Sequence, residues 1–205
     1  VDAAYAIHVL PDDNIVGNFA FAKELFTRMI PMKRLWGAQG SINVAANREL
    51  LDLMADSGCR TLFVGFESVN RKNLAAMGKS GVNRVEEYEE NIKRLHDKGI
   101  RIFGSFIVGL DDDEESVFDD IYEFCCRNKI DFPIVNCLTP FPGTETYSQL
   151  QAEGRIIDRD WSKYNLTNVV IRPKSMEPDK LQFQYNMLVH YLNKMTYANM
   201  QKLHG

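Results

Sequence analysis

Apolar runs and amphipathic stretches alternate along most of the chain. Five runs are rich in strand-forming apolar residues, and three of them end abruptly in polar, glycine or proline residues. Continuous apolar runs are typical of parallel strands that helices cover, whereas strands with one solvated face alternate between apolar and polar residues. We therefore predict an α/β fold whose parallel strands occupy residues 4–10, 33–44, 59–67, 100–110 and 131–140.

The stretches between these runs have the periodicity of helices with one buried face. Asn47 is placed to cap the second of them, and Asn83 and Glu86 are placed to form a capping box. Gly58 and Gly99 are placed to end helices in the left-handed conformation. Five strand–helix units are too few for a closed eight-stranded barrel, so the sheet is either doubly wound or part of a barrel. The predicted helices are 18–30, 47–58, 71–78, 83–99, 114–128, 144–154 and one that begins at Pro178.

Composition and charge are ordinary for a globular protein and exclude some classes of partner. A length of 205 residues suits one domain with a full hydrophobic core. The net charge of −4 gives no reason to expect a nucleic acid as a partner. No apolar stretch approaches the roughly 18 residues needed to cross a bilayer. The four cysteines lack the spacing of a zinc or iron–sulfur site, which predicts reduced thiols in a cytoplasmic protein.

Polar residues stand directly after several predicted strands, where parallel α/β folds place their ligand sites. Plainer interpretations exist for some of them. Residues 12–14 can form a turn, and the acidic run 111–115 precedes a helix whose positive end it would stabilise. The segment 141–147, FPGTETY, can be a turn followed by a helix cap. The polar residues at strand ends are Asp12, Asp13, Ser41, Asn43, Glu67, Ser68, Asp111–Asp113 and Thr139.

Glu67 is the hardest of these residues to explain as a structural one. It ends the run FVGFE, which has the composition of a buried strand. A carboxylate at the inner end of such a strand is costly to desolvate unless it binds a ligand or pairs with a charge at a neighbouring strand end. Gly65 and Gly109 lie inside strand patterns, and glycines there indicate that a ligand or another stretch of backbone approaches closely.

Six segments together resemble the radical S-adenosylmethionine (SAM) enzymes, and more closely the branch that carries an upstream cobalamin-binding domain. The resemblance runs in the correct order between residues 10 and 155, and no single segment would suffice. The segments are LPDDNIVGN (10–18), WGAQGSINVA (36–45), LLDLMADSGCRTLFVGFES (50–68), MGKSGV (77–82), KGIRIFGSFIVGLDDDEES (98–116) and PFPGTETYSQLQAEGR (140–155).

This resemblance implies a partial TIM-type (β/α)6 barrel, in which the five predicted strands match the second to sixth strands of the family. Residues 1–154 would form the partial barrel, and residues 155–205 a C-terminal extension with an irregular segment and an amphipathic helix. The family's first strand is followed by a CxxxCxxC loop that holds a [4Fe-4S] cluster. An external reductant such as flavodoxin or ferredoxin reduces that cluster, which then cleaves SAM to start radical chemistry.

The resemblance also assigns cofactor contacts to residues at the strand ends. Asp12 and Asp13 match the end of the family's second strand, near the methionine part of SAM. Ser41, at the end of the next predicted strand, is a further candidate for contact with the cofactor. Glu67 and Ser68 match the end of the fourth strand, suited to the ribose hydroxyls and the methionyl end, for which a carboxylate is a strong acceptor.

The fifth strand of the family carries a motif written GxIxG, whose backbone and aliphatic side chain meet the adenine. Ser105, Ile107 and Gly109 match this motif, and the first glycine is replaced here by Ser105. No catalytic residue and no metal ligand is assigned in this chain.

The largest departure from the family pattern is that the 205 residues contain no CxxxCxxC. The first strand and the cluster loop would lie upstream of Val1, so we expect the chain to be an inactive fragment of a longer, cobalamin-linked enzyme. That enzyme would methylate, cyclise or rearrange a small organic substrate. Two alternatives are a complete small α/β enzyme with Glu67 and Asp13 in acid/base roles, and a non-catalytic ligand-binding module.

Overall fold

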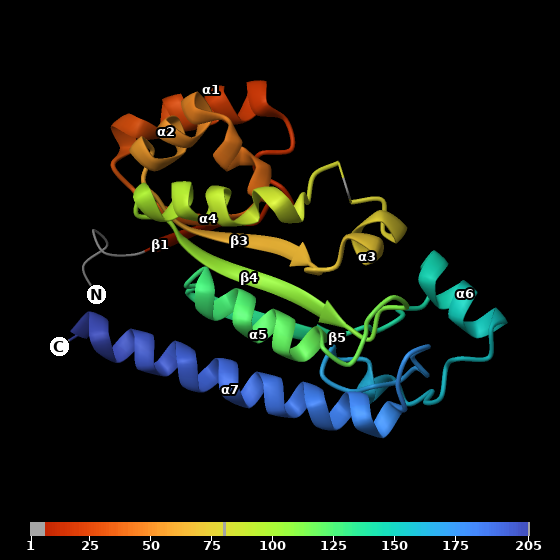
Figure 1. The fold of residues 1–205 in the computed structure, drawn as a ribbon. Coiled ribbons are helices and arrows are strands. Elements are labelled where there is room, and N and C mark those ends of the chain that lie inside the picture. The colour runs from red at the N-terminus through yellow and green to blue at the C-terminus, as the bar shows by residue number, and fades with distance from the viewer. Residues whose placement is uncertain (1–6, 80, 205) are drawn as a thin grey trace. The chain divides into compact units, whose positions relative to one another are not determined.

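The computed structural model describes residues 7–79 and 81–204. The chain folds into two compact units, each of which is considered by itself (Figure 1). The first comprises the described parts of Val1–Phe66, Gly78–Ser105 and Asn128–Pro133, and the second comprises those of Glu67–Met77, Phe106–Arg127 and Ile134–Gly205.

The five strands are parallel and follow one another in the sheet in the order of the sequence. A doubly wound sheet would reverse direction at a switch point, so the sequential order selects the barrel type of winding. The prediction of a parallel α/β fold with barrel-type strands is therefore confirmed. The strands are β1 (Ile7–Leu10), β2 (Leu35–Gln39), β3 (Cys59–Glu67), β4 (Arg101–Val108) and β5 (Phe132–Cys137).

In the first unit, helices lie on one side of β3 (Figure 1). Trp36 of β2 is fully buried, stacks on Phe26 at a centroid distance of 5.2 Å and donates its indole N–H to the carbonyl of Ser57. Phe66 and Tyr88 form an edge-to-face pair at 4.9 Å. The helices of this unit are α1 (Phe19–Met29), α2 (Arg48–Asp56) and α4 (Tyr88–Asp97), with short 3-10 turns η2 (Ile30–Met32), η3 (Ile42–Ala46) and η4 (Val85–Glu87).

In the second unit, a long C-terminal helix packs against α5. Its buried residues Leu181, Tyr185, Leu188 and Leu192 keep the helical spacing expected from the sequence. A small separate core joins α6 to the segment that follows it, through Leu150, Tyr164, Val170 and Ile171. The helices are α3 (Arg71–Ala76), α5 (Val117–Arg127), α6 (Glu145–Ala152), the 3-10 turn η5 (Trp161–Lys163) and α7 (Pro178–His204).

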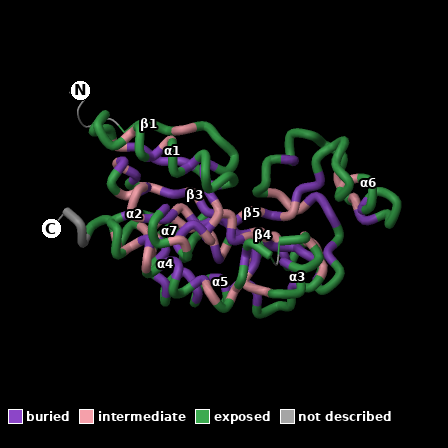
Figure 2. Tube along the Cα trace, turned by 90° about the horizontal axis from the view of Figure 1, so that it is seen from above, coloured by how far each residue is buried: buried purple, intermediate pink, exposed green. Residues whose placement is uncertain are grey.

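Burial follows this organisation along the chain (Figure 2). Buried residues concentrate on β3, β4 and the inward sides of the helices, whereas α6 is mostly exposed. No helix within residues 7–79 and 81–204 is long and apolar enough to span a membrane.

Several predicted helix ends are confirmed. The side chain of Asn47 caps α2 by accepting a hydrogen bond from the N–H of Leu50 at 3.1 Å. Gly58 and Gly99 adopt φ of +98° and +70°. A Cβ at Gly58 would lie 2.1 Å from the carbonyl oxygen of Arg34, so this position needs glycine for space as well as for conformation.

Two predicted elements differ from the structure. The strand predicted at 33–44 ends at Gln39, because the apolar residues of 42–46 are buried through the 3-10 turn η3 instead. The prediction of a capping box formed by Asn83 and Glu86 is wrong. The amide of Asn83 donates to the carbonyls of Gly65 and Phe66, and α4 begins only at Tyr88. Residues 4–6 of the first predicted strand lie outside the described residues.

Replacing the cap of α2 will have a modest effect on stability. Asn47→Ala removes the acceptor for the Leu50 N–H, so we expect the free energy of unfolding in urea to fall by about 1 kcal/mol. Asn47→Asp keeps an acceptor and serves as the matched control, with an unchanged midpoint. Equal midpoints for all three proteins would contradict the capping role.

Candidate cofactor-binding site

In the first unit, Asp12 and Asp13 follow β1 and line an open cavity of about 380 Å³. Gly37 and Thr61 form part of the same wall. A Cβ at Gly37 would lie 2.1 Å from the hydroxyl of Thr61, so the glycine leaves room for that side chain. Both aspartates are exposed, which leaves their carboxylates accessible from this cavity.

Ser41 and Ser105, also in the first unit, have more enclosed surroundings. The hydroxyl of Ser41 accepts a hydrogen bond from the amide of Asn14 at 2.8 Å, and the N–H of Ser41 donates to Asn14 at 3.2 Å. This reciprocal pair joins the ends of β1 and β2, so Asn14 does more than complete a local turn. Ser105 is buried in β4.

In the second unit, Glu67 ends β3 with φ of +64°, in the left-handed region that a glutamate rarely adopts. Such strain is compatible with stable folding only where the surroundings impose it, and it is common at functional sites. The next residue, Ser68, is almost fully buried, and its hydroxyl accepts a hydrogen bond from the N–H of Asn70 at 3.0 Å. Asn70 in turn caps α3 through the N–H of Lys72.

The turn after β4 is held by a buried carboxylate. Gly109, with φ of +90°, donates its N–H to Asp113 at 2.8 Å, and Leu110 donates to the same oxygen at 2.9 Å. The other oxygen of Asp113 accepts from the amide of Asn73, at 2.7 Å. Burial raises the pKa of Asp113 to about 6, outweighing these hydrogen bonds, which lower it.

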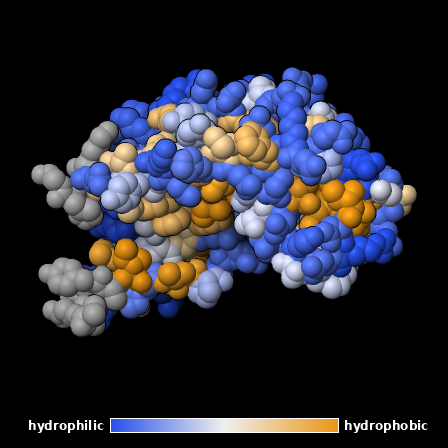
Figure 3. All heavy atoms as spheres, turned by 90° about the horizontal axis from the view of Figure 1, so that it is seen from below, coloured by the Kyte–Doolittle hydropathy of each residue, from blue (hydrophilic) through white to orange (hydrophobic). Residues whose placement is uncertain are grey.

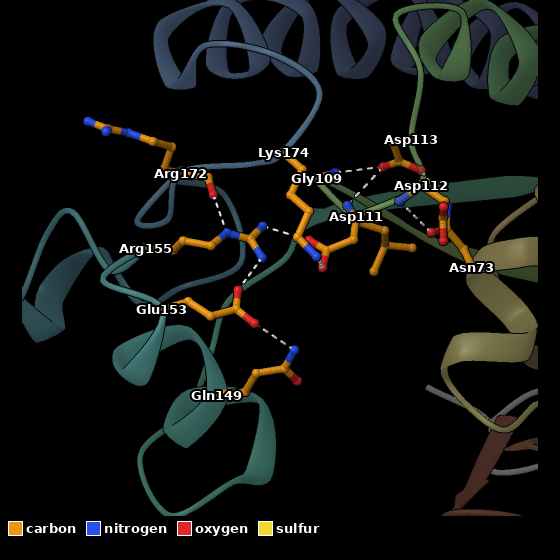
Figure 4. A network of polar contacts seen from close by, with 11 residues as sticks. Asn73, Gly109, Asp111, Asp112, Asp113, Gln149, Glu153, Arg155, Arg172 and Lys174 are labelled. Carbon is orange, nitrogen blue, oxygen red and sulfur yellow. Dashed lines mark hydrogen bonds and ion pairs between the residues drawn. The ribbon is translucent and has the colours of Figure 1, made fainter.

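The same contacts tie the end of β4 to α3, which follows Ser68 (Figure 4). The oxygen of the Asn73 amide accepts a hydrogen bond from the N–H of Asp112 at 3.2 Å, and the amide of Asn70 donates to the Asp112 carbonyl at 2.9 Å. Two candidate cofactor positions, Ser68 and Gly109, are therefore linked by one network. Sequence reasoning missed Asn73 altogether. It placed Asp111–Asp113 at a strand end, as candidate site residues or as a favourable helix start, but did not predict that Asp113 would hold the turn.

Asp111 anchors the C-terminal extension to this turn (Figure 4). Its carboxylate pairs with Arg155 at 2.6 Å and with Lys174 at 2.6 Å. Burial raises the pKa of Asp111, but the hydrogen bonds from these two cations bring it below its ordinary value. Arg155 also donates to the carbonyl of Arg172 and to the carboxylate of Glu153, so its buried guanidinium is held from several sides.

The cysteines behave as packed thiols. Burial raises the pKa of Cys59 and of Cys137 to about 12, and it also raises the pKa of Cys125. Cys126 is exposed. Among the residues that the structure describes, no group of three or more histidine, cysteine or acidic side chains is placed to hold a metal ion.

Comparison with known proteins identifies the family. The profile of the Radical SAM superfamily matches residues 25–125. The bacteriochlorophyllide d C-12(1)-methyltransferase of Chlorobaculum tepidum is 36% identical over 194 residues, which are 95% of this chain and 42% of that protein. The bacteriochlorophyllide d C-8(2)-methyltransferase of the same organism is 33% identical over 157 residues, which are 77% of this chain and 34% of that protein. The chain thus spans less than half of the length of these curated relatives.

A solved structure supports the fold. The radical S-adenosylmethionine methyltransferase TsrM from Kitasatospora setae, determined with cobalamin and a [4Fe-4S] cluster, superposes with a TM-score of 0.61 at 17% identity. The superposition covers 74% of this chain and 30% of that one. The five parallel strands are therefore those of a partial radical SAM barrel. The chain belongs to the Radical SAM superfamily, in its branch of methyltransferases and cyclases.

The described residues do not offer the ligands that a [4Fe-4S] cluster needs. Such clusters are bound by thiolates, and the buried cysteines here have raised pKa values and no common site. No step is therefore assigned to a cluster on residues of this chain.

Proposed function

We propose that this chain is part of a longer, cobalamin-linked radical SAM methyltransferase that methylates a carbon of a chlorin-type macrocycle. One observation carries the proposal: 36% identity to a bacteriochlorophyllide methyltransferase over 95% of the chain, beyond the region that the family profile matches. A second relative, 33% identical, methylates another position of the same macrocycle. The cluster, the cobalamin and a reductant such as flavodoxin or ferredoxin would be supplied outside these residues.

Within the proposed enzyme, residues of this chain bind SAM. By the family resemblance, we assign the methionine part to Asp12, Asp13 and Ser41, and the ribose hydroxyls to Glu67 and Ser68. The strain at Glu67 supports this assignment, because a non-glycine residue at φ of +64° is kept where a particular side chain is needed.

The adenine is assigned to the end of β4. Ser105, Ile107 and Gly109 match the adenine-binding strand of the family in sequence. The hydrogen bond from Gly109 to Asp113 supports the assignment, since it fixes the backbone of the last motif residue. Division of the chain into a barrel part, 1–154, and an extension, 155–205, remains part of the proposal.

The test uses the full-length protein that contains these residues. It is reconstituted anaerobically with iron, sulfide and cobalamin, reduced, and incubated with bacteriochlorophyllide d and SAM that carries a deuterated methyl group. We expect mass spectrometry to find a macrocycle that has gained the labelled methyl group. An unchanged macrocycle beside cleaved SAM would overturn the methyltransferase assignment.

The 205-residue chain alone is the matched control. Because its described residues offer no cluster ligands, we expect it to stay colourless after reconstitution, with less than one iron for every ten chains. A stoichiometric cluster on this chain would contradict the fragment interpretation. Turnover in air without a cluster would favour the acid/base enzyme with Glu67 and Asp13 instead.

A further inference from the structure

The extension between α6 and α7 presents an exposed tryptophan. The chain has two tryptophans. Trp36 is fully buried, whereas Trp161 is 54% exposed, although tryptophan side chains are highly buried on average. Exposure alone does not define a site, since hydrophobic side chains also gather in separate patches elsewhere on the surface (Figure 3). What distinguishes Trp161 is how firmly it is held.

Trp161 belongs to an aromatic cluster. Its ring lies 4.7 Å from that of the buried Tyr164 and 6.2 Å from that of Tyr147 on α6. The hydroxyl of Tyr164 donates to the carbonyl of Asp158 at 2.7 Å, which fixes the second ring of the cluster. The indole thus packs against two tyrosine rings while about half of the residue stays exposed to solvent.

The backbone that carries Trp161 is equally constrained. The side chain of Asp160 accepts hydrogen bonds from the N–H and the hydroxyl of Ser162, which cap the turn η5. Asp158 accepts from the N–H of Asp160 at 2.8 Å and pairs with Lys163. A rigid aromatic side chain loses little conformational entropy when it binds, which is the property of a binding anchor.

The segment is also fixed to the end of β4. Arg155 and Lys174, at its two ends, both pair with Asp111 in the turn after Gly109. Between them, Ile156 and Ile171 form an antiparallel bridge. Trp161 is therefore presented by an element anchored at the carboxyl end of a barrel strand, which is the end where such folds bind ligands.

We propose that Trp161, supported by Tyr147 and Tyr164, is a stacking platform for the flat face of a conjugated macrocycle. The inference rests on the proposed function and assigns the substrate a contact on the extension. Offset stacking on an indole suits a large planar π-system, which gains both buried apolar area and the interaction between rings.

The test measures binding of chlorin e6, a soluble chlorin with its own fluorescence, to the full-length protein by fluorescence anisotropy. We expect Trp161→Ala to weaken binding about tenfold. Trp161→Phe, which keeps a planar ring, should stay within about threefold of the wild type. Tyr197→Ala removes an aromatic residue of α7 that is 62% exposed and should have no effect.

Unchanged binding by Trp161→Ala would overturn the platform, as would equal losses in Trp161→Ala and Tyr197→Ala, which would indicate general hydrophobic adsorption. Absence of chlorin binding by the wild type overturns it too, whether or not SAM binds, and would leave Trp161 as a contact for another part of the protein. The platform is supported if Trp161→Ala binds SAM as tightly as the wild type but binds the chlorin more weakly. If that pattern occurs in a protein that transfers no methyl group, the platform stands and the proposed function fails.

Discussion

Asn73→Leu will destabilise the protein strongly at pH 7 and much less at pH 4.5. The substitution keeps the approximate volume of the side chain but removes the hydrogen bond to the buried carboxylate of Asp113 and the acceptor for the Asp112 N–H. Loss of a hydrogen bond to a buried charged group costs about 1.5–3 kcal/mol. For a chain of this length, that corresponds to a fall of several degrees in the melting temperature.

The pH dependence follows from the sign of the pKa shift at Asp113. Its pKa in the folded protein is raised from 3.8 to about 6, so its stabilising contribution is present below 3.8 and is lost as the pH rises through 6. The hydrogen bond from Asn73 lowers that pKa. Without it the folded pKa rises further, and the additional loss of stability appears only where Asp113 must ionise. At pH 4.5 we expect about half of the effect or less, from the Asp112 N–H left without its acceptor.

A double-mutant cycle isolates the carboxylate. In an Asp113→Asn background no group at that position titrates, so Asn73→Leu should cost the same at pH 7 and at pH 4.5. Melting temperatures of the four proteins at the two pH values measure the cycle. Hydrogen exchange at the Gly109 and Leu110 amides adds a local measurement, because both N–H groups bond to Asp113. A pH-independent cost in the wild-type background would show that Asn73 does not support the ionised carboxylate.

The parts of the fold that sequence predicted well are those fixed by local pattern. The run 59–67 became β3 with the same limits, because an apolar run of that length between Gly58 and Ser68 has few alternatives. Asn47 was identifiable as a cap because its partner lies three residues away. The run 33–44 was misassigned beyond Gln39, since buried apolar residues in a 3-10 turn give the same signal as a strand.

The parts that sequence could not predict depend on partners far along the chain. Asn73 meets Asp113 across 40 residues, and Asn83 meets Gly65 across 18. Each asparagine looks locally like a helix or cap residue, and only tertiary packing reveals which backbone groups it satisfies. The candidate site was predicted as a set of strand ends, but the network that fixes those ends was not.

Glu67→Gly will weaken SAM binding by the full-length protein about 10- to 100-fold while leaving its stability nearly unchanged. The carboxylate proposed to accept the ribose hydroxyls is lost, and a hydrogen bond to a charged group contributes about 1.5–3 kcal/mol. At the same time, glycine adopts φ of +64° without strain, whereas this conformation costs a glutamate about 1–2 kcal/mol. The greater entropy of the unfolded glycine chain offsets most of that gain, by about 0.4–1 kcal/mol.

Calorimetric titration with SAM and thermal unfolding of the same samples separate the two interpretations of Glu67. If Glu67 serves as an ion-pair partner of a neighbouring strand end, Glu67→Gly should lower the melting temperature and leave SAM affinity intact. If it binds the cofactor, affinity falls and the melting temperature does not. Glu67→Gln is the matched control, because it keeps the reach and the strained backbone but offers a neutral acceptor, and we expect its affinity to lie between those of the wild type and Glu67→Gly. If Glu67→Gly relaxes the backbone without loss of stability but with loss of SAM binding, the strain at this position serves ligand binding.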